Sequence, residues 1–217
     1  MSKLKLTQAE IDKLVVVERM AVPPTVCGVG CNDVGFQIAI NRKNIWQYQL
    51  WVNMLQRAFD AKYKQRSPTY EDATCCDEWF SFANFLGWLN EEVECKGHPV
   101  GFALDKDIIV KGNKTYSPDV CSLVPKAVNL LLLDSGATRG EYPQGVNYHK
   151  HTGKFVAQLG VDGNPKHLGL FLTPEDAFAA YKIAKEAQIK VVALQHKDVL
   201  KPAVFESLMN WEIIIDD

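Results

Sequence analysis

Hydrophobic residues recur at helical spacing through the first ninety residues of the chain. Between residues 44 and 64 an apolar position returns every three or four residues, which predicts one amphipathic helix. Its inward stripe is expected to be Trp46, Leu50, Trp51, Met54, Leu55, Ala58 and Phe59. Residues 67–92 are expected to form a loop and a further helix, with inward Trp79, Phe82, Phe85, Leu86 and Leu89. Thr7 and Glu10 have capping-box spacing, so residues 1–20 are expected to form a short helix that ends before Pro23.

Apolar and polar residues alternate from residue 145 onward, and this pattern is typical of strands. Val146 with Tyr148, then Phe155 with the apolar residues after it, and then residues 167–171 predict three short strands separated by turns. Thr173 precedes Pro-Glu-Asp, which is a helix start with a capping hydroxyl, a first-turn proline and two acids. The apolar face of this helix is expected to be Ala177, Phe178, Ala180, Tyr181 and Ala184. Residues 202–209 predict another helix, and the apolar tail after it could cover a core or form a dimer contact.

Four landmarks within residues 145–186 carry a family resemblance. They are the opening Gly-Val, the Gly-Lys-Phe turn at residues 153–155, Leu-Gly-Leu-Phe at 168–171 and the Thr-Pro-Glu-Asp-Ala helix start. Together they resemble the APETALA-type, ethylene-response-factor DNA-binding domain. The resemblance implies a three-stranded sheet that lies in the major groove of duplex DNA. By position it implies these DNA contacts, with Arg139 as an arm ahead of the first strand: Tyr148, Lys150, Lys154, Gln158, Lys166 and His167.

The charge pattern of this segment departs from that family. Plant members carry several arginines on the sheet, whereas residues 145–186 contain none. Bidentate guanine contacts are therefore not expected, and we expect lower affinity and weaker sequence selectivity. The alternative interpretation is that Lys150, Lys154 and Lys166 only protect exposed sheet edges.

Residues 104–129 predict a strand, a loop, a second strand and a helix. Residues 104–110 form the expected first strand, 117–125 lead into the second, and a helix follows Pro125. Gly112 suits a backbone conformation that other residues resist, and Asn113 has an amide that can organise the loop. The plain alternative is a β-hairpin that turns at Gly112 and Asn113, with ordinary surface carboxylates.

The same order of residues resembles an HNH nuclease hairpin and helix. A Cys-x-Glu-Trp segment like that at residues 76–79 also precedes the hairpin in phage proteins of this kind. The resemblance implies Asp105 and Asn129 as ligands of Mg²⁺ or Mn²⁺, Lys106 at the position of the base, and Asn113 as the fourth catalytic candidate. No histidine occurs between Gly101 and Val146, and an ordinary lysine is protonated near pH 7, so Lys106 is expected to contact phosphate.

Composition and charge limit the partners and the cellular location that can be expected for this chain. The chain has 217 residues, 47% of them hydrophobic, and a formal net charge of −2, which argues against indiscriminate nucleic-acid binding. Residues 106–154 contain seven Lys or Arg against four Asp or Glu, so a modest basic zone is expected there. The apolar runs are too short to span a bilayer and no secretory core is present, so a cytoplasmic protein is expected.

The six cysteines contain no Cys-x-x-Cys pair. Reduced, mostly buried thiols are expected from this spacing. A structural zinc site formed by Cys76 and Cys121 with Cys95 or His98 is the alternative.

We therefore expect an α+β protein in two parts. Residues 1–138 form a helical region with a degenerate HNH-like ββα unit, and residues 139–217 form the APETALA-like domain with a C-terminal extension. The first hypothesis is a phage or mobile-element DNA endonuclease, which is either a nickase or an enzyme that cuts both strands. The second is a catalytically inactive DNA-binding protein, and the third is a phage factor whose fold binds a host defence protein or a nucleotide signal.

Overall fold

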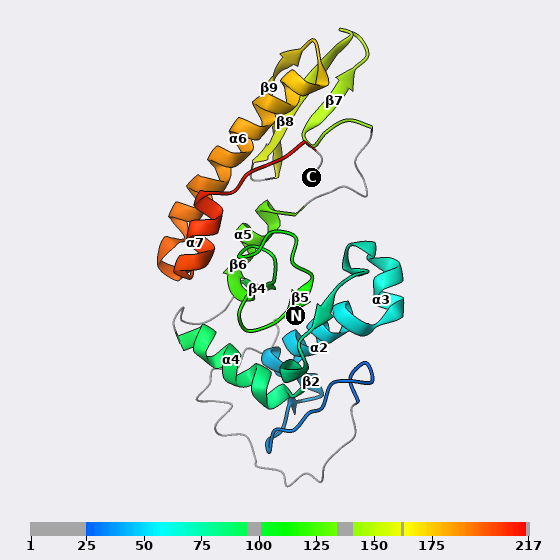
Figure 1. The fold of residues 1–217 in the computed structure, drawn as a ribbon, viewed down its shortest axis with the longest axis vertical. Helices are drawn as coiled ribbons and strands as arrows, with labels where there is room; N and C mark the ends of the chain where they lie inside the picture. The colour runs from blue at the N-terminus through cyan, green and yellow to red at the C-terminus, as the bar shows by residue number, and fades with distance from the viewer. Residues whose placement is uncertain (1–24, 95–100, 134–140, 162, 216–217) are drawn as a thin grey trace. The chain divides into compact units, whose positions relative to one another are not determined.

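A computed structural model describes residues 25–94, 101–133, 141–161 and 163–215 (Figure 1). Helices alternate with several small sheets, which confirms the expected α+β class. The chain divides into two compact units, Met1–Val124 and Pro125–Asp217, called here the first and second units. The domain boundary expected after residue 138 lies outside the described residues, as do the expected Thr7 capping box and Arg139.

The core of the first unit is built on α2 (Trp46–Phe59) and α4 (Phe82–Glu94). The expected inward residues Trp51, Met54 and Leu55 of α2 are buried, as are Trp79 and the expected apolar stripe of α4. Trp51 Nε1 donates to the Trp79 carbonyl at 2.7 Å and joins α2 to the short 3₁₀ helix η2 (Asp77–Phe80). The aromatic side chains of this region therefore form a packed core.

The expected helix over residues 44–64 is two helices in the structure. α2 ends at Phe59 and α3 (Ala61–Arg66) begins after Asp60, whose backbone is extended. The Asp60 side chain accepts the Tyr63 backbone N–H at 2.9 Å. An aspartate in this position caps a new helix more favourably than it continues an old one, which accounts for the break. The 3₁₀ helix η1 (Pro68–Tyr70) follows.

Short strands complete the first unit. β1 (Ala39–Ile40) and β2 (Lys43–Asn44) form an antiparallel hairpin, and β3 (Thr74–Cys75) pairs in parallel with β5 (Thr115–Tyr116). β4 (Phe102–Asp105) pairs with β6 (Ser122–Pro125). The expected first strand over residues 104–110 is therefore wrong in its extent, and the hairpin expected around Gly112 does not form. The segment after that turn pairs with β3 instead.

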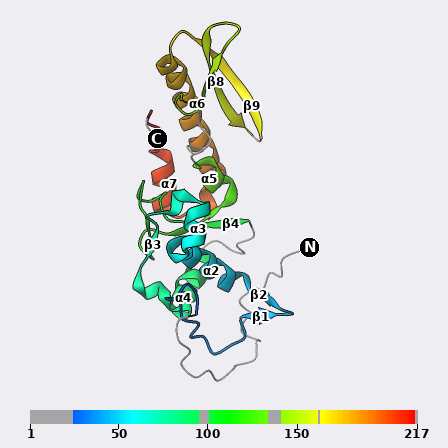
Figure 2. The same cartoon turned by 90° about the vertical axis from the view of Figure 1, so that its right-hand side faces the viewer.

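The second unit contains the sheet that the sequence predicts. β7 (Val146–His149), β8 (Lys154–Val161) and β9 (Asn164–Phe171) are antiparallel in the order β7-β8-β9, with a β-bulge at Ala157 and Gln158. The helix α6 (Pro174–Gln195) runs along the sheet (Figures 1 and 2) and packs against its strands. Thr173 Oγ1 accepts the Asp176 backbone N–H at 3.1 Å, which confirms the predicted cap.

The rest of the second unit packs around α6. α5 (Lys126–Leu131) and α7 (Pro202–Met209) contact α6, and the 3₁₀ helix η4 (Lys197–Val199) precedes α7, whose predicted bounds are confirmed. Residues 211–214 have no regular structure, and Ile213 is buried, with its backbone N–H donating to Glu186 at 2.9 Å. Part of the apolar tail therefore covers α6. Among the described helices none combines the length and apolar character that a bilayer span requires.

Candidate functional site

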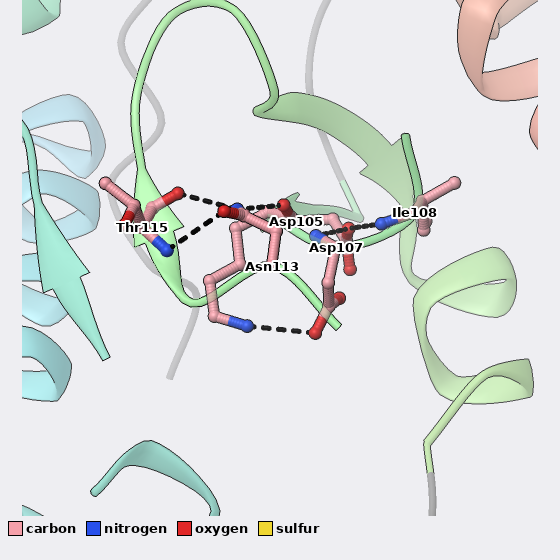
Figure 3. Close-up of polar contacts among 6 residues, drawn as sticks. Asp105, Asp107, Ile108, Asn113 and Thr115 are labelled. Atoms are coloured by element: carbon pink, nitrogen blue, oxygen red, sulfur yellow. Dashed lines mark hydrogen bonds and ion pairs between the residues drawn. The ribbon is translucent and has the colours of Figure 1, made fainter. Parts of the chain in front are cut away.

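Asp105 closes the strand β4 and turns the chain into the loop before β5. One of its carboxylate oxygens accepts the backbone N–H groups of Asp107 and Ile108, each at 2.9 Å (Figure 3). Burial raises the pKa of Asp105 to about 6, and the nearby Asp107 carboxylate contributes to the rise, while the two N–H donors oppose it. These local bonds compete with the sheet ladder, so the strand stops at Asp105.

Lys106, the residue after Asp105, is buried. Its Nζ lies 2.9 Å from Asp107 Oδ2 and 5.9 Å from the ring centroid of Tyr116. An ammonium group held between a carboxylate and an aromatic face is a hydrogen-bond donor and a cation. The surroundings of Lys106 therefore fit a phosphate contact and offer little to a general base.

Asn113 fixes the loop. Its Nδ2 donates to the carbonyls of Lys106 and Thr115, both at 2.7 Å, and its Oδ1 accepts the Thr115 backbone N–H at 3.2 Å (Figure 3). Gly112 beside it has a φ of +79°, the left-handed conformation for which a glycine was expected. The side chain of Asn113 thus organises residues 106–115. Its three hydrogen bonds are all made to backbone groups.

The expected metal ligands lie in different units. Asp105 belongs to the first unit, and Asn129 lies half-buried in α5 of the second. The described part of the chain contains no group of three or more His, Cys, Asp or Glu side chains that could hold a metal ion. Asp105 and Asp107 each keep one carboxylate oxygen outside the bonds drawn in Figure 3. Mg²⁺ is often held by one or two carboxylates together with waters and substrate phosphates, so this donor set fits Mg²⁺ or Mn²⁺ in that limited form.

The described cysteines are thiols buried to different degrees. Cys75 and Cys121 are buried, and burial raises the pKa of the Cys121 thiol to about 12. Burial raises the Cys76 pKa as well. Cys95 and His98, which the alternative zinc site requires, lie outside the described residues.

The second candidate site is one face of the β7-β8-β9 sheet. Val146, Ala157 and Leu159 share the face that is buried against α6. Strand alternation puts the intervening residues on the opposite face, called here the open face. Three of the expected DNA contacts come together on it by register: Lys154, Gln158 and its cross-strand partner His167. Lys154 and His167 are exposed and Gln158 is half-buried.

The other expected DNA contacts are placed differently. Tyr148 pairs with Phe155, on the α6 side of the sheet by alternation, with ring centroids 5.3 Å apart. Lys166 pairs with Leu159 and so falls on that side too, exposed on the edge strand β9. Lys150 is exposed in the turn between β7 and β8.

Two open-face residues are missing from the sequence-based set. Asn147 and His149 are exposed on β7 and alternate with the buried Val146. His149 Nδ1 lies 3.0 Å from Thr152 Oγ1, within the turn that carries Lys150. Strict period-two alternation counted from Val146 would have identified both residues, and it would also have moved Tyr148 off this face.

Comparisons with protein-family models, with curated proteins and with solved structures return no match for this chain.

Proposed function

We propose that the second unit binds duplex DNA through the open face of its sheet. The observation that carries the proposal is a set of polar side chains that bond to nothing else. Lys154, Gln158 and His167 have no hydrogen-bond or ion-pair partner within the described part of the chain, and no acidic residue lies among the described positions of this face. Uncommitted donors on a three-stranded sheet are the groups that phosphates and base edges require.

The composition of the open face indicates which of its residues would contact phosphates and which would contact bases. Lysines at the β7–β8 end are suited to phosphates, which position a protein without reading sequence. Gln158 can pair with an adenine edge in the major groove. With no arginine on the sheet, guanine readout is weak, so we expect moderate affinity with a modest preference among sequences.

Binding can be tested with a fluorescently labelled duplex of about 30 base pairs, titrated with the full chain at several salt concentrations. The logarithm of the binding constant should fall linearly with the logarithm of the salt concentration, by about 0.9 per neutralised phosphate. A flat salt dependence would contradict the proposal. So would equal binding by a variant in which Lys150 and Lys154 are both replaced.

A second candidate function, divalent-metal-assisted phosphodiester hydrolysis, is favoured by the Asp105 loop. A half-buried carboxylate closes a strand, a loop is tied by an asparagine amide, and a second strand and a helix follow in chain order, as the HNH resemblance implies. Asp105 would hold the metal, with Asp107 as the further oxygen ligand. Bound Mg²⁺ or Mn²⁺ would supply charge stabilisation at the scissile phosphate. Lys106 would donate to a phosphate oxygen and orient it. In this view the chain is an endonuclease or nickase acting in the cytoplasm of a bacterial host.

Hydrolysis can be tested by incubating supercoiled plasmid with the chain and Mg²⁺ or Mn²⁺ and measuring the nicked and linear products. Asp105→Ala and Asp107→Ala should each abolish cleavage and leave duplex binding within about twofold, because a metal ligand contributes to charge stabilisation and not to docking. Lys106→His should raise the rate if a missing base limits it. Cleavage that persists in both alanine variants would place the reaction elsewhere.

The two assays together separate the hypotheses. Binding without nicking supports the catalytically inactive DNA-binding protein. A chain that neither binds nor nicks would turn the search to a host defence protein or a nucleotide signal.

A further inference from the structure

The tip of the β1–β2 hairpin in the first unit presents cations in a strained turn. Asn41 and Arg42 have φ values of +50° and +62°, the left-handed pair of conformations that a tight two-residue hairpin requires. Asparagine tolerates this conformation, but an arginine there costs about 1 kcal/mol relative to glycine. Arg42 and the following Lys43 are both exposed. The hairpin tip thus keeps an arginine where glycine would be easier to accommodate.

A ladder of side-chain amides continues from this hairpin onto α2. Asn44 Nδ2 donates to Gln49 Oε1 at 3.2 Å, and Gln49 Nε2 donates to Asn53 Oδ1 at 2.8 Å. Gln49, Asn53 and Arg57 are spaced four residues apart, so they lie along one side of the helix. The hairpin and the helix therefore carry one continuous line of polar side chains. Figure 2 shows β1 and β2 next to α2.

Arg57, at the end of that line, is a cation without an anion. Its guanidinium lies 5.4 Å from the ring centroid of Tyr70, and its buried Nε has no hydrogen-bond partner. No ion pair joins it to a carboxylate within the described part of the chain. Burial lowers the pKa of Arg57, but hydrogen bonds and charge interactions with Tyr116 and other tyrosines more than offset that effect. A half-buried guanidinium of this kind is costly unless an anion reaches it.

Arg57 is connected to the candidate catalytic loop through Tyr116. The Tyr116 side chain that bonds to Arg57 has Lys106 Nζ 5.9 Å from its ring centroid. Two cations thus meet one phenol ring, and Lys106 is the residue after Asp105. Two carboxylates of the first unit are engaged in local bonds: Asp60 caps α3, and Asp107 pairs with Lys106.

We propose that this line of side chains binds the phosphate backbone of a nucleic-acid strand and leads it toward the Asp105 loop. We call it the α2 track, and its members are Arg42, Lys43, Asn44, Gln49, Asn53 and Arg57. Arg57 supplies the buried phosphate contact. The inference rests on the proposed function, because it adds a second contact surface for the same nucleic acid.

The spacing of the track favours a phosphate backbone over an isolated anion. Gln49 and Arg57 are eight residues apart on α2, or about 12 Å. Backbone phosphates of one strand follow each other about every 3.4 Å along the duplex axis, so the helical part alone spans about three of them. Amides and cations contact phosphates without reading bases. The α2 track should therefore add affinity and salt dependence equally for all sequences.

The test uses the full chain and the labelled duplex at several salt concentrations. Arg42→Gly with Lys43→Ala removes two cations without straining the turn, because glycine suits the φ of residue 42. The matched control, Lys62→Ala with Arg66→Ala, removes two exposed cations from α3. The track variant should bind about tenfold more weakly with a salt slope lower by about 1.8, and the control should change binding less than twofold.

A parallel variant of the sheet, Lys150→Ala with Lys154→Ala, separates this inference from the proposed function. If the track variant alone loses affinity, the α2 track stands and the sheet proposal falls. A loss confined to the sheet variant overturns the α2 track. If neither variant loses affinity, both are overturned, and losses in both support both.

Arg57 is tested by Arg57→Met, which keeps an apolar stem of similar length. Affinity should fall about fivefold or more, while the melting temperature should fall only modestly, because the variant removes a half-buried charge together with the bonds that it makes to tyrosine side chains. A lower melting temperature with unchanged affinity would show that Arg57 is structural and remove it from the α2 track.

Discussion

The Asp105 loop and the open sheet face use polar side chains in opposite ways. In the loop, Asp105, Lys106 and Asn113 all bond to neighbouring groups of the protein itself. On the sheet, Lys154, Gln158 and His167 have no such partner within the described part of the chain. The internal bonds of the loop fix its shape, whereas the unbonded groups of the sheet face keep their full bonding capacity for a ligand. The type of a polar residue does not by itself tell whether its side chain bonds within the protein or is left for a ligand.

This contrast has an energetic counterpart. Removing a loop side chain leaves partly buried backbone groups without partners, so the loss appears as stability. Removing an open-face side chain exposes nothing, so under the proposed function the loss would appear only when DNA is present. Substitutions in the loop should therefore have the largest effects on stability, and substitutions on the open face should act mainly on binding.

Asn113→Ala should lower the free energy of unfolding by about 3 kcal/mol, because three hydrogen bonds are lost and two backbone carbonyls lose their donor. Urea denaturation followed by tryptophan fluorescence measures this, since Trp51 and Trp79 report on the first unit. Asn147→Ala on the open face is the matched control and should change stability by less than about 0.5 kcal/mol. Equal effects in the two variants would remove the distinction between loop and sheet.

The titration of Asp105 gives the second prediction. Its pKa is raised from 3.8 to about 6 in the folded state, so the folded protein favours the protonated carboxyl. The corresponding stability is fully present below pH 3.8 and is lost as the pH rises through 6. Relative to Asp105→Asn, the wild type should therefore lose about 2 kcal/mol between pH 4 and pH 7 in metal-free buffer. Asp119→Asn, an exposed aspartate of the same unit, is the control. Parallel stability curves for wild type and Asp105→Asn would contradict the assignment.

The third prediction concerns affinity. Lys150→Ala with Lys154→Ala should weaken duplex binding about tenfold for every sequence tested and lower the salt slope by about 1.8, with stability unchanged. Lys166→Ala provides a sharp comparison with the single change Lys154→Ala, because the register puts Lys166 on the α6 side of the sheet. Lys154→Ala should have the larger effect. A larger loss from Lys166→Ala would show that DNA approaches the edge strand and not the open face.

The smallest effect is expected from Gln158→Ala. Its loss should cost about 1 kcal/mol at one base-pair position and leave the salt slope unchanged, because an amide reads a base edge and neutralises no phosphate. A competition assay with a randomised duplex pool measures the change in sequence preference. An unchanged preference, or a reduced salt slope, would assign Gln158 to the backbone or to no contact.

Local sequence signals predicted the second unit well because its elements follow from short-range chemistry. The Thr173 cap, the alternation from Val146 and the turn glycines each act over a few residues. The helical stripes of the first unit were predicted for the same reason. α6 is longer than the resemblance suggested, since the helix continues to Gln195.

The candidate site was harder to predict because it depends on competition and on distant pairing. Asp60 and Asp105 end a helix and a strand through bonds from their own side chains, which compete with the regular backbone pattern. Residues 115–116 pair with residues 74–75, far away in the sequence. Burial of Lys106 and the unpaired state of Arg57 follow from such tertiary contacts, and no local motif encodes them.

The three bonds of Asn113 also bear on how the protein would age. Asparagine is among the thermolabile residues, and its slow deamidation produces a carboxylate. At residue 113 that change would replace an NH₂ group by an oxygen that faces the carbonyls of Lys106 and Thr115, now 2.7 Å from the amide nitrogen. Two donor bonds would become repulsive contacts. A deamidated Asn113 would therefore mark a more acidic species in which the loop beside Asp105 has loosened.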